Sequence, residues 1–408
     1  MNCRALMLMA MAIATLAIHA LAGELKIDAA FPGGNLLVDG MEGDVVRVRQ
    51  DRRDTPRFWF HWSFRVRGAA GRTLTFQFQD GHVFGTQGPA VRVNDEPWRW
   101  LGRGGLVANA FRFSFPTDAR EVHFSFAIPY LEEDLRRFLD AHANLRVETL
   151  TRSEHGRPIE MLRCGATPGP GQPAVLIVCR HHACESAANF VAEGLMEAVL
   201  ADDRLGRSLR ESIAFRCIPF MDKDGVEEGD QGKARAPHDH WLDYRGDSKY
   251  AAVRALKALC AGGERCDLAL DLHCPYLSDD RVFLALGSDV RVAAGVDRLA
   301  RILQSTRAGE LRYDAADNLP FGASWNRRGE YGELHNFVDW AEQLRGMTAA
   351  GTFEVPYASV RGVATTPANL RSLGRDLARA IDCYFRQDGA SMFHIHGPAT
   401  TAREARSK

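Results

Sequence analysis

Residues 173–200 read PAVLIVCRHHACESAANFVAEGLMEAVL, and this stretch decides the fold. The apolar run from Pro173 to Val178 predicts a buried strand, and the residues after Glu185 have the spacing of an amphipathic helix. The polar turn between them, 179–185, therefore follows the carboxyl end of a strand. Open α/β sheets build their sites at that end, so we expect a functional site in this turn.

The turn holds His182 and Glu185, with two residues between them. Two further apolar runs, CDLALDLH and MTAAGTFE, end in His273 and Glu354. A catalytic zinc ion takes three protein ligands and keeps one position open. The strand ends together predict a single Zn²⁺ bound by His182, Glu185 and His273, with Glu354 left as a general base. Each motif alone also fits a hydrogen-bonded structural residue, so the prediction rests on their combination.

The motifs HACE, MDKDGVEEGDQGKARAPHDH, DLHC and TFEVPY resemble those of the M14 zinc carboxypeptidases, especially the cytosolic-carboxypeptidase-like branch. The resemblance covers about residues 24–388. It implies a zinc-dependent amide hydrolase with an amino-terminal β domain. The family's zinc ligands fall on His182, Glu185 and His273, and its catalytic glutamate falls on Glu354.

The resemblance also assigns roles to two residues of the polar loop 220–246. Arg235 stands where bacterial relatives place an arginine ahead of a Pro-His-Asp motif, so we expect it to stabilise the tetrahedral oxyanion. A salt bridge or a solvated position is the alternative for this arginine. Asp239 matches the aspartate that orients the first zinc histidine, here His182. The alternative for Asp239 is a residue that only forms a turn.

One departure from the family concerns the substrate. The family follows that aspartate with Asn-Arg, which holds the terminal carboxylate of the substrate, whereas Trp241 and Leu242 stand here. An arginine is the natural partner of a carboxylate, so Arg327 or Arg328 is a candidate for a relocated anchor. Trp241 is a candidate for apolar contact with the substrate, although packing under the loop is equally compatible with its position.

The missing anchor leaves three functional hypotheses. The first is a metallocarboxypeptidase that cleaves the carboxyl-terminal peptide bond. The second is an amidase, deacylase or esterase whose substrate lacks a free carboxylate. The third is a non-catalytic protein that binds peptides or the cell wall, and Glu354 argues against it because a binding module needs no general base.

The chain has 408 residues, which is enough for two domains. We expect an antiparallel β-sandwich over 23–128, from short alternating runs rich in aromatic residues. An α/β domain is expected over 129–388, where strands and helices alternate, and a polar tail over 389–408. The tryptophans of the first domain indicate core packing or, alternatively, a sugar-binding face: Trp59, Trp62, Trp98 and Trp100.

Residues 1–22 combine Arg4, an apolar run and Ala-Leu-Ala before Gly23. This pattern is typical of a secretory signal peptide cleaved after Ala22, with an uncleaved membrane anchor as the alternative. We therefore expect export to the periplasm or exterior, no membrane span in the mature chain, and a peptide or cell-wall peptide as substrate. Cys260 and Cys266 are the most plausible disulfide pair in such a compartment.

Lys and Arg number 51 and Asp and Glu number 52, so the charges nearly cancel. A nucleic-acid-binding protein shows an excess of basic residues. The balance therefore gives no argument for nucleic acid or for an anionic membrane as a partner.

Overall fold

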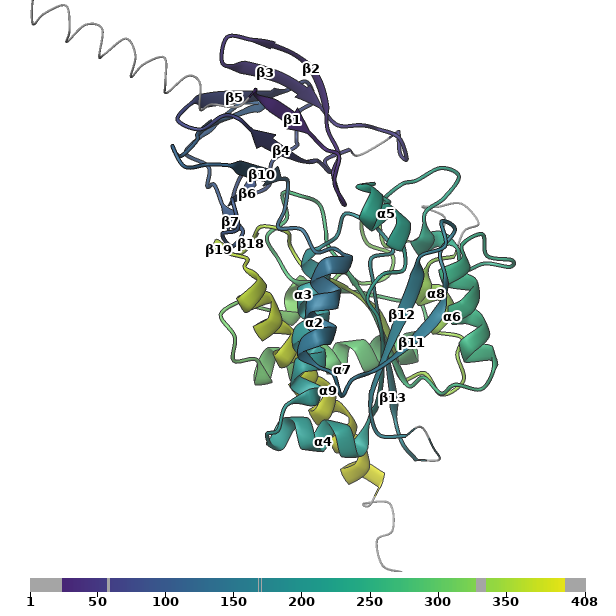
Figure 1. Ribbon diagram of the computed structural model, residues 1–408. Coiled ribbons are helices and arrows are strands. Elements are labelled where there is room, and N and C mark those ends of the chain that lie inside the picture. Colours follow the sequence, from purple (N-terminus) through teal and green to yellow (C-terminus); the bar gives the residue numbers. More distant parts are fainter. Residues whose placement is uncertain (1–23, 57–58, 168, 170, 328–334, 393–408) are drawn as a thin grey trace, which may run out of the picture.

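A computed structural model describes residues 24–56, 59–167, 169, 171–327 and 335–392 (Figure 1). The predicted signal peptide and residues 393–408 of the predicted tail lie outside these ranges. No helix among the described residues has the length and apolar character to cross a membrane.

The amino-terminal part of the described chain, up to Ser125, forms a β domain of two five-stranded sheets. The described strand pairs are antiparallel, except that β3 and β5 run parallel. The first sheet has the order β1 (Lys26–Asp28), β4 (Ser63–Arg67), β10 (Glu121–Ser125), β6 (Ala90–Val93) and β7 (Arg99–Trp100). The second has the order β2 (Leu37–Glu42), β3 (Val45–Arg49), β5 (Thr73–Phe78), β9 (Ala110–Ser114) and β8 (Leu106–Val107).

Aromatic side chains fill the space between these sheets. Alternate residues of β5 point inward, so Leu74, Phe76 and Phe78 are buried while their neighbours are more exposed. Trp62 is fully buried, and its Nε1 donates to the Val83 carbonyl at 2.8 Å. Trp62 therefore packs in the core and Trp98 and Trp100 pack against it, as the simpler of the two interpretations predicts, whereas Trp59 lines a hollow beside the α/β domain.

The remainder of the described chain is an α/β domain around a seven-stranded mixed sheet. Four central strands are parallel and the outer ones antiparallel. The order is β11 (Arg146–Arg152), β12 (Pro158–Gly165), β14 (Ala214–Ile218), β13 (Ala174–Cys179), β15 (Leu268–His273), β17 (Ala349–Glu354) and β16 (Phe283–Leu286). A short hairpin joins β18 (Ser359–Val360) to β19 (Val363–Ala364).

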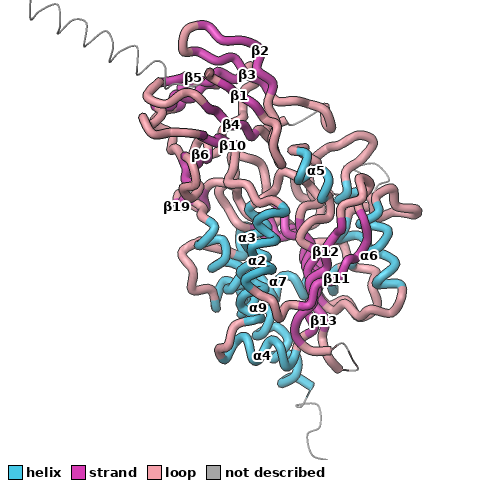
Figure 2. The backbone as a smooth tube through the Cα atoms, viewed as in Figure 1, coloured by secondary structure: helices cyan, strands magenta, loops and turns pink. Residues whose placement is uncertain are grey.

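Helices cover both faces of this sheet (Figures 1 and 2). On one face lie α3 (Ala187–Leu200), α7 (Val290–Thr306) and α9 (Pro367–Met392), and on the other α6 (Ala251–Ala261) and α8 (Phe337–Ala341). In β13, Val175 and Ile177 face the first layer, and Leu176 and Val178 face the second. Burial on both faces explains why this strand is a continuous apolar run.

Several boundaries differ from the sequence predictions. Helix α4 (Arg204–Ser212) was not predicted, and α9 continues to Met392, into the predicted tail. Loop 220–246 contains α5 (Lys223–Glu228) and the 3-10 helix η1 (His240–Leu242), and many of its residues are buried. The eight described cysteines are all free, so the predicted pairing of Cys260 with Cys266 is wrong.

The β domain packs directly on this loop. Asn35 Nδ2 donates to the Gly229 carbonyl at 2.8 Å, and Gln231 Oε1 accepts from the backbone N–H of Phe60 at 2.8 Å. The Phe60 ring also contacts Tyr357 of the α/β domain, with ring centroids 5.9 Å apart. A polar loop is buried here because another domain supplies its hydrogen-bond partners.

Candidate active site

The predicted metal ligands come together at the carboxyl ends of neighbouring strands. His182 and Glu185 lie in the turn between β13 and α3, and His273 is the last residue of β15. Glu354 ends the next strand, β17, directly opposite His273 in the ladder. Parallel strands end at the same edge of a sheet, which explains why residues so distant in sequence meet here.

The three ligand side chains converge on one point. His182 Nδ1 lies 3.2 Å from His273 Nδ1 and 2.9 Å from Glu185 Oε1, and His273 Nδ1 lies 2.8 Å from Glu185 Oε2. Zinc bonds of 2.0–2.1 Å in a tetrahedron imply ligand separations of about 3.3 Å. Two imidazole nitrogens and a carboxylate at these distances therefore fit a zinc ion.

Each histidine contacts a carboxylate through its second nitrogen. His182 Nε2 lies 3.3 Å from Asp239 Oδ2, and His273 Nε2 lies 2.8 Å from Asp271 Oδ2. Such partners orient metal-binding histidines and fix which nitrogen faces the metal. The structure therefore places Asp239 beside His182, where the sequence analysis expected it.

Asp271 was missed in the sequence, although it stands two residues before His273 on the same strand and so shares its face. Its Oδ1 accepts from His181 Nδ1 at 2.9 Å, and His181 Nε2 lies 2.8 Å from the Tyr244 hydroxyl. Burial alone would raise the pKa of Asp271, but His181 and His273 lower this pKa to about 2. Asp271 is therefore an anionic support for His273.

Glu354 has the environment of a proton acceptor. Its carboxylate is buried, and its Oε2 has no hydrogen-bond partner within the described ranges. Burial raises the pKa of Glu354 to about 7, Glu185 adds to this, and His273 opposes it. A carboxylate with such a pKa can exchange a proton at neutral pH.

Arg235 does not occupy the position that the sequence analysis gave it. Its guanidinium lies 3.0 Å from Asp222, 2.8 Å from Asp230 and 3.4 Å from Asp54 of the β domain. Burial and the neighbouring Asp54 raise the pKa of Asp230 to about 7. The Arg235 guanidinium is thus ion-paired with three carboxylates in a buried cluster between the domains. The sequence analysis predicted that it binds the oxyanion, and these contacts do not place it to do so.

Lys233, two residues before Arg235, reaches the metal-ligand cluster instead. Its Nζ lies 2.9 Å from Glu185 Oε1 and 3.3 Å from the Cys274 carbonyl oxygen. No sequence pattern predicts this contact, because a single lysine in a polar loop is ordinarily solvated.

Two tryptophan rings, Trp241 and Trp325, form an aromatic wall beside the metal-ligand cluster. The Trp241 ring lies with its centroid 6.0 Å from those of both His182 and His273, and 6.2 Å from that of Trp325. Leu242 is buried in the core beneath α6 and α8. Arg327 is exposed, and Arg328 lies outside the described residues. The structure thus brings Trp241, and not Leu242, to the metal-ligand cluster.

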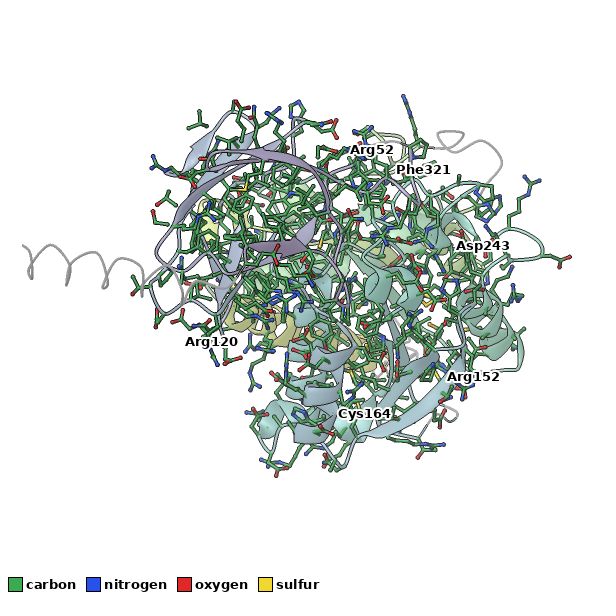
Figure 3. All side chains as sticks on the ribbon, turned by 45° about the horizontal axis from the view of Figure 1, so that its top comes forward. Arg52, Arg120, Arg152, Cys164, Asp243 and Phe321 are labelled. Atoms are coloured by element: carbon green, nitrogen blue, oxygen red, sulfur yellow. The ribbon has the colours of Figure 1, made fainter. Side chains whose placement is uncertain are left out.

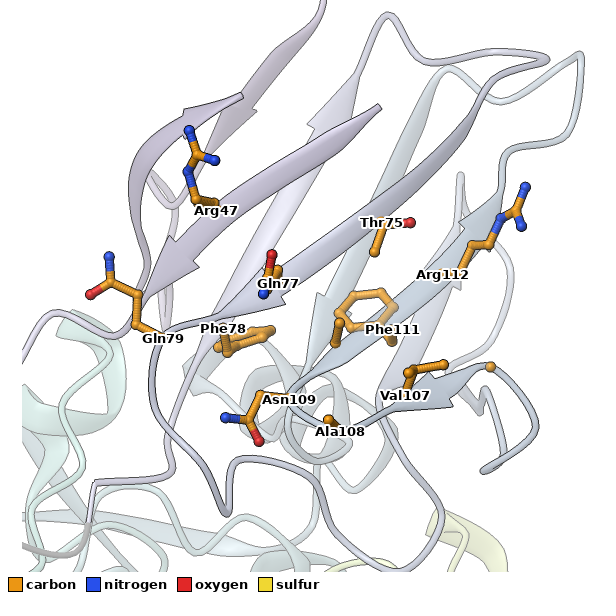
Figure 4. Close-up of a pocket in the computed structure, with 12 residues that line it drawn as sticks. Arg47, Thr75, Gln77, Phe78, Gln79, Val107, Ala108, Asn109, Phe111 and Arg112 are labelled. Carbon is orange, nitrogen blue, oxygen red and sulfur yellow. The ribbon is translucent and has the colours of Figure 1, made fainter. Parts of the chain in front are cut away.

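Several hollows are lined by described residues of the β domain, and two of them differ in how near they lie to the cluster. The first, of about 460 Å³, lies between the domains and is lined by Arg52, Trp59 and Tyr276 among others; Arg52 is labelled in Figure 3. The second, of about 650 Å³, lies over β5 and β9 and includes Gln77, Asn109 and Arg112 (Figure 4). The first borders the α/β domain at Tyr276, three residues after His273, and is therefore the one placed near the cluster.

Comparisons with known proteins relate part of the chain to the zinc carboxypeptidases. The sequence profile of the zinc carboxypeptidase family, Peptidase M14, matches residues 131–262. Human cytosolic carboxypeptidase 6 is 23% identical over 256 residues, which are 54% of this chain and 50% of the relative. The chain thus spans about half the length of the curated relatives it matches.

Solved structures share the fold over most of the chain. A metallo-carboxypeptidase from Burkholderia cenocepacia superposes with a TM-score of 0.73 at 19% identity, over 89% of this chain and 99% of that one. One from Pseudomonas aeruginosa, in complex with (2-guanidinoethylmercapto)succinic acid, gives 0.72 at 20% identity, with coverages of 89% and 99%.

The α/β fold is shared with solved metallo-carboxypeptidases, and its cluster of two histidines and a glutamate offers three ligands for a metal ion. Residues 131–262 match the M14 zinc carboxypeptidase family, and the chain is similar to the cytosolic carboxypeptidases.

Proposed function

We propose that the protein is a zinc-dependent metallocarboxypeptidase that hydrolyses the carboxyl-terminal bond of a peptide. His182, Glu185 and His273 would hold a zinc ion, which when bound would supply a Lewis acid and lower the pKa of its water. Glu354 would take a proton from the attacking water and deliver it to the leaving amine. The observation that carries this proposal is the buried Glu354 carboxylate, with its raised pKa, directly opposite His273.

The aromatic wall favours one alternative, an amidase, deacylase or esterase. Trp241 beside the two histidines offers an apolar surface where the family holds a carboxylate. A substrate with a blocked or apolar end would suit this surface, whereas a free carboxylate requires an anchor elsewhere, such as Arg327 or Arg328. We further propose that the protein is exported, and that peptides or cell-wall peptides are its substrates.

The test uses the purified chain without residues 1–22, with and without a chelator. One peptide series is supplied in two forms, as free acids and as carboxyl-terminal amides. We expect chelator-sensitive release of the last residue from the free acids. Cleavage of the amides instead would support the alternative, and stoichiometric zinc without turnover on either form would support a binding protein.

Glu354→Gln is the matched variant, because it keeps the side-chain size and removes the proton acceptor. We expect kcat to fall by about 10²- to 10⁴-fold, while the zinc content, measured by atomic absorption, stays at one per chain. Equal rates for the wild type and Glu354→Gln would refute the role of this glutamate.

A further inference from the structure

Lys233 is fixed in place by its two neighbours along the chain. The Gly232 N–H donates to Asp54 Oδ2 of the β domain at 2.7 Å, and the Ala234 N–H donates to Asp239 Oδ2 at 3.1 Å. Gly232 has a φ of +76°, and a Cβ there would lie 2.4 Å from the Ala183 backbone nitrogen. The backbone around Lys233 is thus packed directly on the turn that carries His182 and Glu185.

The Lys233 side chain reaches from this backbone to the edge of the buried cluster. Its ammonium contacts Glu185, and it also lies 5.9 Å from the ring centroid of Tyr276, a residue that is 47% exposed. The side chain itself is 25% exposed. The ammonium therefore lies at the boundary between the metal ligands and the solvent from which a substrate enters.

The Lys233 ammonium has two polar contacts within the described chain, one of them the ion pair with Glu185 Oε1 at 2.9 Å. An ammonium group has three N–H donors. Among the described residues, the Lys233 ammonium has two acceptors, Glu185 Oε1 and the Cys274 carbonyl oxygen. Its third N–H can therefore bind a substrate oxygen.

The neighbouring arginines are engaged elsewhere. The Arg235 guanidinium lies among Asp54, Asp222 and Asp230. Arg180 is buried, and its guanidinium donates to the Ala183 carbonyl at 2.8 Å and to Asn189 Oδ1 at 2.9 Å. Both arginines contact several protein acceptors, whereas the Lys233 ammonium has two in the part of the chain that the structure describes, one of which is the metal ligand Glu185.

We propose that Lys233 binds the anionic oxygen of the tetrahedral intermediate, the role that the sequence analysis gave to Arg235. This inference rests on the proposed hydrolase function. Water attacks the carbonyl carbon, a C–O bond forms, and the carbonyl π pair moves onto the oxygen. Glu354 takes one proton from the water, and Lys233 donates a hydrogen bond to the oxyanion without losing its proton. When the C–N bond breaks, the amine nitrogen takes the proton from Glu354.

The test compares Lys233→Met, Lys233→Arg and, as a matched exposed control, Lys26→Met. Zinc affinity is measured by competition with a chelator. Affinity for a phosphinic peptide, whose tetrahedral anionic group replaces the scissile amide, is measured by calorimetry on the zinc-loaded proteins. Steady-state kinetics on the free-acid and amidated peptides separate kcat from KM.

For Lys233→Met we expect zinc affinity equal to or above that of the wild type, because Lys233 and zinc share Glu185. We expect phosphinic-peptide affinity to fall about 100-fold, and kcat to fall about 10²- to 10³-fold with KM nearly unchanged. Lys233→Arg should recover part of both losses, and Lys26→Met should match the wild type.

An unchanged phosphinic-peptide affinity in Lys233→Met would overturn the proposal. Loss of zinc in both Lys233 variants would also overturn it, since Lys233 would then support Glu185 alone. A wild type that binds zinc but neither cleaves the peptides nor binds the phosphinic peptide would refute the proposed function itself, and the role of Lys233 with it.

Discussion

Each metal-binding histidine of this site is paired with an aspartate. The aspartate contacts the second ring nitrogen and so orients the imidazole. His182 is paired with Asp239 from a loop, and His273 with Asp271 from its own strand. The second pair continues through His181 to Tyr244, all of them buried. Buried polar chains of this kind keep a side chain in one orientation only while every member is satisfied.

Asp271→Asn should therefore weaken zinc binding about 10- to 100-fold, since an amide is a poorer acceptor for the His273 and His181 rings. The measurement is chelator competition on the purified variant, with the exposed Asp140→Asn as control. An unchanged zinc dissociation constant would show that Asp271 does not position His273.

His61 makes a pH-dependent contribution to stability. It is buried at the domain boundary, and burial, followed by Arg180 and Arg53, lowers its pKa from 6.5 to about 3. The unfolded chain binds this proton below its own pKa of about 6.5 and the folded chain does not, so stability falls as pH drops from about 6.5 toward 3. At pH 5 the loss is about 2 kcal/mol.

The His61→Asn variant lacks this titration. Urea denaturation at pH 7 and pH 5 should therefore show a smaller loss of unfolding free energy in the variant, by about 2 kcal/mol. Equal losses in the two proteins would contradict the assignment of the titration to His61.

At the scale of elements, the turn that carries the ligands is held by the packing of α3 on α9. The two helices approach so closely that glycines lie at their crossing. A Cβ on Gly194 of α3 would lie 2.0 Å from the Arg371 carbonyl oxygen, and a Cβ on Gly374 of α9 would lie 2.0 Å from that of Val191. Helix α3 begins two residues after Glu185, so this crossing also fixes the ligand turn.

Gly194→Ala should destabilise the protein, although alanine favours a helix by about 1 kcal/mol over glycine. Separating the helices to admit the methyl group costs about 1–3 kcal/mol, which we expect to exceed that gain. Thermal unfolding measures the change, with Gly104→Ala as control because a Cβ there meets nothing within 4 Å. A higher unfolding temperature for Gly194→Ala than for the wild type would show that α3 and α9 can separate to admit the methyl group without loss of stability.

At the scale of the whole molecule, the β domain completes the site loop of the α/β domain. Asp54, Phe60 and Asn35 each bond to residues of 229–235. The Phe60 ring also lies 5.7 Å from Phe126 and 5.9 Å from Tyr357, which joins the two hydrophobic cores. A shared apolar core and a shared loop couple the folding of the two domains.

We therefore expect one unfolding transition, with far-ultraviolet circular dichroism and tryptophan fluorescence coinciding in guanidinium. Phe60→Ala should lower the unfolding free energy by about 3–5 kcal/mol, and Phe60→Leu by less. Two separate transitions in the wild type would show that the domains fold independently.

The class of fold and the edge of the sheet that carries the site were predictable from local sequence patterns. Each predicted central strand lies within two residues of its observed position, because strands buried on both faces are continuous apolar runs. The order of strand, turn and helix then required His182, Glu185, His273 and Glu354 to share one edge of the sheet. These signals are local, so they can be read without knowledge of distant contacts.

Which cation faces the site depends on contacts that exist only in the folded protein. Lys233 and Arg235 stand two residues apart in one polar loop, and nothing local distinguishes them. The carboxylate that separates their roles, Asp54, comes from the other domain, where it accepts from Gly232 N and pairs with Arg235. The energy of a charged side chain depends on partners brought together by folding, and such long-range pairings leave no periodic pattern in the chain.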